Sequence, residues 1–282
     1  MKLDRSALDA HALPPVIDGD KESKGRVLVV VGSRDSPGAA LLAATAAMRA
    51  GAGKLRIATV ESIAVELGTA MPEAKVFALP EGSDSGFAAA ATSQIAEQAG
   101  KVDAVVAGPG LTRNAVCGRI ANALLQSKAR LALDAALLHE LQPSSVKRSS
   151  VPILLPHSGE LASLLECREK DVEGDPVGCG LHAARLYHAN VLVKGVTSHV
   201  VTPSGDVWTY EGHAPGLGVS GSGDVLAGIV GGLLARRAHP VNALLWAVWL
   251  HGEAGAKLAK SVGPIGFLAR EIADEVPALL PR

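Results

Sequence analysis

The stretch Gly216-Leu217-Gly218-Val219-Ser220-Gly221-Ser222-Gly223-Asp224 decides the fold that the sequence predicts. Glycines alternate there with small residues, and an apolar helix is expected directly afterwards, over residues 224–236. Backbone N–H groups at the start of a helix can hold a phosphate, whereas bulky side chains would block its approach. The pattern therefore predicts an anion-binding turn at the N-terminus of a helix.

Asp224 lies at the mouth of this predicted anion site, where its carboxylate would repel phosphate unless it had a task. We interpret Asp224 as a base that takes the proton from an attacking hydroxyl during phosphoryl transfer, while the backbone amides stabilise the transferring group. The alternative is a helix N-cap, but a cap alone does not explain the glycines before it. The turn also lacks the Gly-Lys-Ser/Thr start of a Walker A helix.

Upstream of this turn, residues 26–60 predict a βαβ unit. Residues 26–31 are a β-branched run that ends in the loop 32–38, residues 39–50 form an Ala-rich helix, and residues 55–60 return as a strand. The switch from strand to helix and back, with short connections, is typical of a parallel sheet.

The same alternation continues along the chain. Further strands are expected near residues 75–79, 103–107, 130–133 and 151–155, and further helices over residues 87–98, 115–127 and 241–260. Residues 191–193, 198–202 and 206–210 are short strands, with a Pro203-Ser204-Gly205 turn between the last two. We therefore predict an α/β fold in which a central, mostly parallel sheet carries helices on both faces and an appended antiparallel hairpin.

Length and composition favour one domain. Apolar residues make up 48% of the 282 residues but aromatic residues only 3%, so small aliphatic side chains must fill the interior. No repeat or linker interrupts the pattern. We expect a single domain over residues 1–282, with residues 1–24 as an N-terminal extension before the first strand.

The composition also limits the partners and the compartment. A net charge of −1 gives no reason to expect a nucleic acid or an acidic membrane as a partner. Cys117, Cys167 and Cys179 show no CxxC spacing, which indicates neither a disulfide framework nor a zinc site. Residues 1–25 contain no apolar run typical of a secretory signal, and the apolar segment 241–250 is too short to span a bilayer. We expect a soluble, cytoplasmic protein that binds a small molecule.

The loops after the predicted strands gather glycines and polar groups. They are residues 33–38, residues 108–110, Asp134 and residues 156–160. In open parallel sheets the binding crevice lies beyond the carboxyl ends of the strands, so these loops should meet at one edge. Each loop by itself is also explained by the needs of a turn.

Two segments near this edge leave alternatives open. Lys194-Gly195-Val196-Thr197-Ser198 follows a strand and either contacts a nucleotide or carries a solvated lysine on a hairpin. His157 and Glu160 either face the crevice or serve the local structure, where the Glu favours the helix dipole and the His closes a turn.

The sequence also gives expectations for two further histidines and for a metal ion. His213 and His251 are expected to support the structure or line the edge of a pocket. No Cys or His near His157 and Glu160 gives a metal-ligand spacing, so Mg²⁺ would arrive largely with the nucleotide.

Taken together, these motifs resemble the NAD(P)H-hydrate dehydratase family, a carbohydrate-kinase-like group with a ribokinase-like fold. The resemblance spans about residues 24–280. It rests on six motifs in order, which are Gly32-Ser33 with Pro37-Gly38-Ala39, residues 49–53 (Arg-Ala-Gly-Ala-Gly), Gly108-Pro109-Gly110, residues 156–160 (Pro-His-Ser-Gly-Glu), Val193-Lys194-Gly195, and residues 221–228 (Gly-Ser-Gly-Asp-Val-Leu-Ala-Gly).

The resemblance implies a lyase that repairs damaged NADH and NADPH. Members use ADP or ATP to phosphorylate the hydroxyl on the hydrated nicotinamide ring of the S epimer, NADHX or NADPHX. Loss of phosphate then restores the reduced dinucleotide and leaves AMP or ADP. The family also implies Mg²⁺, a homotetramer, and a functional link to an NAD(P)H-hydrate epimerase, which here would be a separate protein.

The resemblance also assigns roles to residues of this chain. Asp224 would be the catalytic base and contact the substrate. The residues implied to hold the nucleotide are Lys194, Gly195, Val196, Thr197 and Ser198 for its AMP portion, together with Gly221, Ser222 and Gly223. Those implied to contact the hydrated dinucleotide are Ala39, Gly110 and His157.

Some positions depart from the family pattern. Ser222 replaces the usual Thr and keeps the hydroxyl, whereas Ala136 replaces a second carboxylate after Asp134. Ser158 replaces the Pro of a Thr-Pro-His-Pro-Gly-Glu segment, and Leu155 replaces its Thr. Two alternatives follow: another ribokinase-like kinase, acting on a vitamin precursor or a sugar, and a catalytically weak nucleotide-binding protein, which the loss at Ala136 suggests.

Overall fold

A nine-stranded sheet forms the centre of the part of the chain that the computed structural model describes, namely residues 1–15, 21–143, 148–212 and 214–281. Its strand order is β3-β2-β1-β4-β5-β6-β7-β8-β9. The strands are β1 (Arg26–Val30), β2 (Lys54–Val60), β3 (Ala74–Leu79), β4 (Ala104–Ala107), β5 (Arg130–Leu133), β6 (Ile153–Leu154), β7 (Asn190–Val193), β8 (Thr197–Val201) and β9 (Val207–Glu211).

The first seven strands run parallel to one another, and the two last pairings of the sheet, β7 with β8 and β8 with β9, are antiparallel. The pairs from β3 across to β7 are all parallel, whereas β8 pairs antiparallel with both β7 and β9. Continuous apolar runs explain the central strands, since every residue of β4 and β7 is buried. The predicted parallel sheet with an appended antiparallel hairpin is confirmed.

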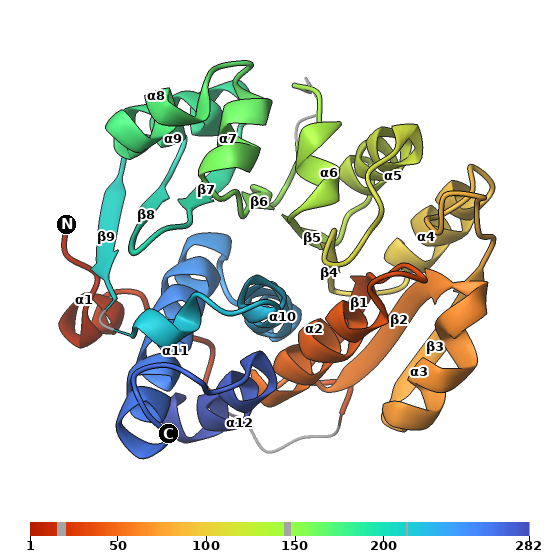
Figure 1. Cartoon of the computed structure of the whole chain (residues 1–282), viewed down its shortest axis with the longest axis horizontal. Coiled ribbons are helices and arrows are strands. Elements are labelled where there is room, and N and C mark those ends of the chain that lie inside the picture. The colour runs from red at the N-terminus through yellow and green to blue at the C-terminus, as the bar shows by residue number, and fades with distance from the viewer. Residues whose placement is uncertain (16–20, 144–147, 213, 282) are drawn as a thin grey trace.

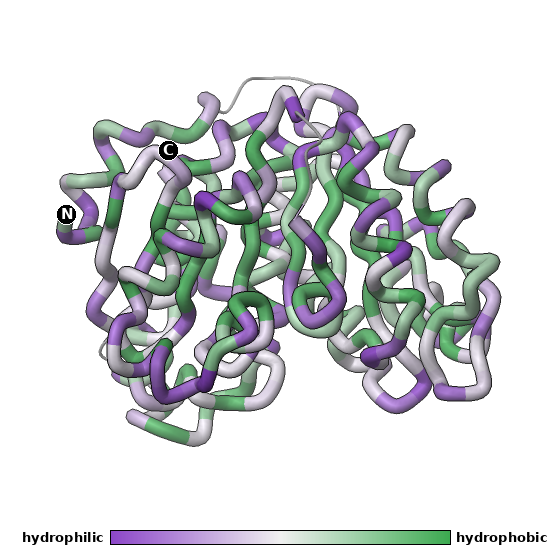
Figure 2. Tube along the Cα trace, turned by 90° about the horizontal axis from the view of Figure 1, so that it is seen from above, coloured by the Kyte–Doolittle hydropathy of each residue, from purple (hydrophilic) through white to green (hydrophobic). Residues whose placement is uncertain are grey.

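Helices cover both faces of the sheet (Figure 1). Helices α2, α10, α11 and α12 lie on one side, and α4, α5, α7 and α9 on the other. The helices are α1 (Arg5–Asp9), α2 (Pro37–Arg49), α3 (Ala64–Ala70), α4 (Ala91–Ala99), α5 (Ala115–Leu125), α6 (Ala136–His139), α7 (Ser158–Leu164), α8 (Glu169–Gly174), α9 (Pro176–Leu186), α10 (Ser222–Ala235), α11 (Pro240–Ser261) and α12 (Ala269–Leu279), with 3₁₀ turns η1 (Glu61–Ile63) and η2 (Pro215–Leu217). Figure 2 shows the hydrophobic residues gathered along the central strands.

Helix α10 is the central helix of the fold. It packs on α2, β1, β4 and β5, and every residue from Val225 to Ala235 is buried. Its contact with α2 is close, because a Cβ built on Gly228 would lie 2.2 Å from the carbonyl oxygen of Ala43. A helix held this firmly fixes the position of the glycine-rich turn at its N-terminus.

The N-terminal extension is attached to the far edge of the sheet. Lys2 bridges Thr209 of β9 in parallel, and the N–H of Leu3 donates to the Thr209 carbonyl at 2.7 Å. Leu8 of α1 is fully buried, and the guanidinium of Arg5 lies over the ring of Trp246 at 4.8 Å. Residues 1–15 therefore pack against β9 and α11.

Several predicted boundaries differ from the structure. Helix α4 begins at Ala91 instead of residue 87, because Phe87 bridges Glu81 and residues 88–90 form turns. Strand β6 has only two residues, and α10 begins at Ser222, two residues before the predicted start. His213 lies outside the described residues. Within them, every helix is too short or too polar to cross a membrane.

Candidate active site

The glycine-rich turn forms the N-terminus of α10. Gly221 is the N-cap with a left-handed φ of +88°, and Ser222 and Gly223 open the helix. This φ lies in the region that favours glycine, and a Cβ on Gly221 would also lie 2.4 Å from Leu42 Cδ1 of α2, which would then have to move. The amides of the first helical turn have no partner within the helix, as an anion site requires, although the N–H of Ser222 donates to the Val219 carbonyl at 3.2 Å.

Asp224 lies in the first turn of α10 and is not its N-cap. The N-cap alternative is therefore wrong, because Gly221 occupies that position. Burial and the carboxylate of Asp134 together raise the pKa of the Asp224 carboxyl to about 6, and the ammonium of Lys194 only partly opposes them. A carboxyl with this pKa is largely ionised at neutral pH and more basic than an exposed Asp, which suits a general base.

Lys194 lies opposite this turn, at the end of β7. Its Nζ donates to Asp134 Oδ1 at 2.8 Å and lies 3.7 Å from Glu160 Oε2, and only 20% of its side chain is exposed. A Cβ built on Gly223 would lie 3.9 Å from the same Nζ. The alternative of a solvated lysine on a hairpin is therefore wrong.

The charge of Lys194 survives its burial. Burial disfavours the ammonium, but the carboxylates of Asp134 and Glu160 outweigh it and raise the pKa of Lys194. Asp134 itself is 2% exposed at the end of β5. The site therefore holds a fixed cation facing the glycine turn, where it can neutralise a phosphate.

His157 has a structural role and also faces the crevice. It is the N-cap of α7, and its Nδ1 accepts from the N–H of Gly159 at 3.0 Å, while Glu160 accepts from the His157 N–H at 2.9 Å. The N–H of Lys194 donates to the carbonyl of Pro156 at 2.9 Å, which joins this loop to β7. For His157 the two alternatives therefore hold together, whereas the buried Glu160 serves the local structure and does not line the cavity.

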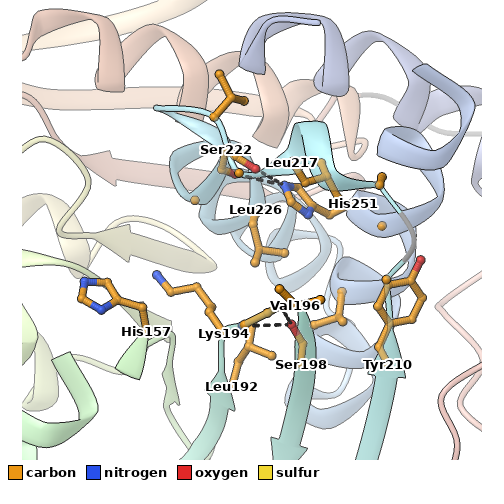
Figure 3. A pocket seen from close by; sticks show the side chains of 18 of the residues that line it. His157, Leu192, Lys194, Val196, Ser198, Tyr210, Leu217, Ser222, Leu226 and His251 are labelled. Atoms are coloured by element: carbon orange, nitrogen blue, oxygen red, sulfur yellow. Dashed lines mark hydrogen bonds between the residues drawn. The ribbon is translucent and has the colours of Figure 1, made fainter. Parts of the chain in front are cut away.

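A cavity of about 1000 Å³ runs from Lys194 and Gly223 along β7, β8 and α11 (Figure 3). Of the predicted nucleotide residues, Thr197 and Gly221 are not part of its lining, and neither is Asp224. It is lined by His157, Leu192, Lys194, Gly195, Val196, Ser198, Tyr210, Gly212, Ala214, Pro215, Leu217, Gly218, Val219, Ser222, Gly223, Leu226, Val248, His251 and Gly252.

Sequence reasoning missed most of the apolar wall of this cavity. Tyr210, Val248 and Leu226 come from β9, α11 and α10, and nothing in their local sequence distinguishes them from core residues. His251 does line the cavity, as one of its two expected roles required.

The predicted dinucleotide residues Ala39 and Gly110 adjoin each other on the other side of the turn. A Cβ on Gly110 would lie 2.5 Å from the Cβ of Ala39 and 3.0 Å from the carbonyl oxygen of Ser36. Ala39 opens α2 after β1, and Gly110 follows β4. Because β1 and β4 are neighbours whose chains leave in opposite directions, this is the switch point where α/β sheets bind ligands.

The chain is similar to known proteins in sequence and in structure. The sequence model of a family described as NAD(P)H-hydrate dehydratase matches residues 27–278. The chain belongs to the NAD(P)H-hydrate dehydratase family. The resemblance inferred from the six motifs is thereby confirmed.

Individual members of the dehydratase family match nearly the whole of this chain. The ADP-dependent (S)-NAD(P)H-hydrate dehydratase of Xanthomonas campestris is 43% identical over 278 residues, which cover 98% of this chain and 95% of that one. The bifunctional NAD(P)H-hydrate repair enzyme Nnr of Gloeobacter violaceus is 37% identical over 90% of this chain, and the match covers 49% of its own length. The chain thus spans about half of that bifunctional relative.

Solved structures agree with the family assignment. The Bacillus subtilis ADP/ATP-dependent NAD(P)H-hydrate dehydratase, co-crystallised with ATP/Mg²⁺, superposes with a TM-score of 0.86 at 26% identity, covering 99% of this chain and 96% of that one. A ribokinase-like superfamily protein from Enterococcus faecalis gives 0.82 at 23% identity, covering 99% of this chain and 94% of that one. The expected ribokinase-like fold is confirmed.

Proposed function

We propose that this protein catalyses the ADP- or ATP-dependent dehydration of the S epimer of hydrated NADH and NADPH. The observation that carries the proposal is the position of the turn Gly221–Asp224 between two sites. On one side it meets α2, which bears Ala39, and on the other it faces Lys194 and the cavity. A nucleotide in the cavity and a dinucleotide at Ala39 and Gly110 would therefore meet at Asp224.

The chemistry follows from this arrangement. Asp224 takes the proton from the ring hydroxyl, and the oxygen attacks the terminal phosphorus of ADP or ATP, whose bond to the bridging oxygen breaks to release AMP or ADP. The phosphate ester then eliminates: the C–O bond breaks, phosphate leaves with the electron pair, and the adjacent ring carbon loses a proton. Phosphate leaves far more readily than hydroxide, so cleavage of the nucleotide drives the elimination.

The other site residues bind and orient the two substrates. Gly223 and Gly221 would present backbone amides to the phosphates, Ser222 would lie beside them with its N–H bonded to the Val219 carbonyl, and the ammonium of Lys194 would neutralise the phosphate charge. The hairpin segment from Gly195 to Ser198 would lie against the AMP portion. Support for the dinucleotide assignments comes from the contact between Ala39 and Gly110.

The carboxylates of Asp134 and Glu160 fit a magnesium ion that is bound mainly through the nucleotide. No group of three His, Cys, Asp or Glu side chains in the described ranges could form a metal cage. Mg²⁺ retains water and typically takes one or two carboxylates beside substrate phosphates, and Asp134 and Glu160 would hold that water shell. When bound, the ion would supply neutralisation of phosphate charge.

The same proposal covers the setting of the enzyme. We propose a cytoplasmic homotetramer with a catalytic domain over residues 1–282, including the extension 1–24, and a functional link to an epimerase that interconverts the hydrate epimers. The existence of bifunctional relatives supports the link to an epimerase. Light scattering of the purified protein should give the mass of four chains, and a monomer or dimer would contradict the tetramer.

A turnover assay tests the function. Purified protein is mixed with hydrated NADH and either ADP or ATP, and the return of reduced-nicotinamide absorbance is followed together with AMP or ADP. We expect recovery with at least one nucleotide. No recovery with either one, at concentrations where a known dehydratase works, would contradict the proposal, whereas accumulation of a stable phosphorylated product would favour a kinase.

A further inference from the structure

His251 of α11 is fixed against the first residue of α10. Its Nε2 lies 3.1 Å from the backbone carbonyl oxygen of Ser222 and 3.0 Å from the Ser222 Oγ. A carbonyl oxygen only accepts hydrogen bonds, so Nε2 must carry the hydrogen. This contact sets both the orientation of the ring and its tautomer.

The imidazole is neutral, so its second nitrogen is an acceptor. Burial, with a smaller effect of the charge of Lys194, lowers the pKa of His251 to about 4, although the hydrogen bond to the Ser222 carbonyl acts in the opposite direction. With the hydrogen on Nε2, Nδ1 keeps a lone pair at neutral pH. Figure 3 shows one ring nitrogen joined to Ser222 and the other turned away from it.

Nδ1 is a hydrogen-bond acceptor in the cavity that the described part of the protein leaves without a donor. Within the described residues no hydrogen bond reaches His251 Nδ1, and the wall beside it is formed by Leu217, Leu226 and Val248. His251 itself belongs to the cavity lining. An acceptor in an apolar wall calls for a donor on the ligand.

The other polar side chains of the cavity are already engaged. Tyr210 donates to Glu253 Oε1 at 3.1 Å, Ser198 donates to the carbonyl of Gly195 at 3.1 Å, and Lys194 is paired with Asp134. Apart from His251, few polar side chains of the cavity are therefore left to select the nucleoside part of the nucleotide.

We propose that His251 Nδ1 accepts a hydrogen bond from the nucleoside part of the ADP or ATP, and that His251 thereby contributes to nucleotide selectivity. The proposal rests on the proposed function. The chemistry that His251 recognises is an N–H or O–H donor, and a nucleoside of adenine offers two sources: the ribose hydroxyls and the exocyclic amino group of the base. Ser222, which holds His251, immediately precedes the phosphate-binding Gly223, so a nucleoside attached to those phosphates lies within reach of this wall.

Equilibrium binding separates the two sources. Titration calorimetry would measure ADP, 2′-deoxy-ADP, 3′-deoxy-ADP and inosine diphosphate, which lacks the amino group, against the unaltered protein, His251→Phe and His251→Gln. We expect the unaltered protein to bind one analogue about tenfold more weakly than ADP. His251→Phe should bind ADP about tenfold more weakly and lose that discrimination.

His251→Gln serves as the rescue variant. Its amide N–H can donate to the Ser222 carbonyl while its oxygen replaces Nδ1 as an acceptor, so it should restore part of the discrimination. Loss of discrimination against a deoxy analogue identifies a ribose hydroxyl, and loss against inosine diphosphate identifies the amino group. Either result supports the proposal.

Equal weakening of all four nucleotides by His251→Phe, with discrimination unchanged, would overturn it and leave His251 with a structural role alone. If His251→Phe does not fold, His251→Gln still tests the proposal, because its partly restored discrimination should differ from that of the unaltered protein, and identical discrimination would contradict the proposal. Unaltered protein that binds neither ADP nor ATP would contradict the proposed function and this inference with it. Normal ADP binding without coupling to residue 251 would contradict only the inference.

Discussion

At the scale of single residues, Asp224 combines two unfavourable conditions. Its carboxyl is mostly buried, and the carboxylate of Asp134 acts on it from the same site, so the ionised form is disfavoured. Lys194 offsets only part of this effect because Asp134 already holds its ammonium at 2.8 Å. The raised pKa makes the Asp224 carboxylate basic enough to take a proton from a hydroxyl group. A bound phosphate would lie beside this carboxylate.

Replacement of Asp224 by Asn should separate catalysis from binding. Asn has the same shape but cannot take a proton, so turnover should fall by about 10²- to 10⁴-fold while the Kd for ADP changes little. Steady-state kinetics and calorimetry would measure the two quantities. Turnover within a few fold of the unaltered protein would remove Asp224 from the role of base.

The rate should also depend on pH in a defined window. Because the pKa of Asp224 is raised to about 6, the base is protonated and inactive below that value, so kcat should rise with pH up to about 6 and then level off. AMP formation is the appropriate readout, since reduced nicotinamides decay in acid. A rate that stays flat between about pH 5 and pH 7 would mean that no group with this pKa acts as the base.

The raised pKa of Asp224 also predicts that the stability of the fold falls as the pH rises, whereas kcat rises. A carboxyl whose pKa is raised from 3.8 to about 6 binds more protons in the folded than in the unfolded state, so stability falls as pH rises through that window. Asp224→Asn should therefore stabilise the fold at neutral pH by on the order of 2 kcal/mol, less any screening by solvent. Urea unfolding at neutral pH and near pH 3 checks this, because the gain should vanish where both states are protonated.

At the scale of elements, the sequence predicted those helices and strands that a local residue pattern encodes. The unit β1-α2-β2 was found because a β-branched run, an Ala-rich run and glycines succeed one another within residues 26–60. Helix α9 was not found, since Gly178 and Gly180 weaken its helical pattern, although Asp175 caps its N-terminus and Pro176 opens it. That Asp-Pro pair was an available signal.

The site shows the same division. The turn at Gly221 to Asp224 is continuous in sequence and was predicted from it, whereas the pair of Lys194 and Asp134 joins residues 60 positions apart. Their meeting depends on β5, β6 and β7 being neighbours in the sheet, a tertiary fact that no local pattern expresses. For that reason the sequence could not decide whether Lys194 contacts a nucleotide or is a solvated lysine on a hairpin.

The contact between α10 and α2 yields a prediction about elements. An Ala side chain at Gly228 would place its Cβ 2.2 Å from the backbone oxygen of Ala43, so the helices would have to separate. Gly228→Ala should lower the free energy of unfolding by about 3 kcal/mol. Gly174→Ala in α8 is the matched control, since nothing lies within 4 Å of its Cβ, and it should change stability by less than about 0.5 kcal/mol. Equal stability of both variants in urea unfolding would contradict this account of the contact.

At the scale of the whole molecule, the site joins most of the fold. Its residues come from α2, β7, α7, α10 and α11 and from the loops after β4 and β5, which together span the sheet from β1 to β9. A nucleotide that contacts several of these elements binds the folded state alone, so its binding free energy adds to the stability of the molecule. Loss of binding should therefore be visible as loss of this added stability, even in a variant whose fold is intact.

Thermal unfolding with and without ADP tests this coupling. At about a hundredfold excess of ADP over its Kd the fold should gain roughly 2.7 kcal/mol, or about 5 °C in Tm. Gly223→Val should lose most of this shift, because the branched side chain would occupy the space between the α10 amides and Lys194 Nζ, which lies only 3.9 Å from a Cβ at that position. Asp224→Asn should keep the shift, since it removes the base and leaves the amides in place. A full ADP shift in Gly223→Val would mean that the nucleotide phosphates bind away from the turn at Gly221 to Asp224, and a lost shift in Asp224→Asn would mean that this carboxylate serves binding as well as catalysis.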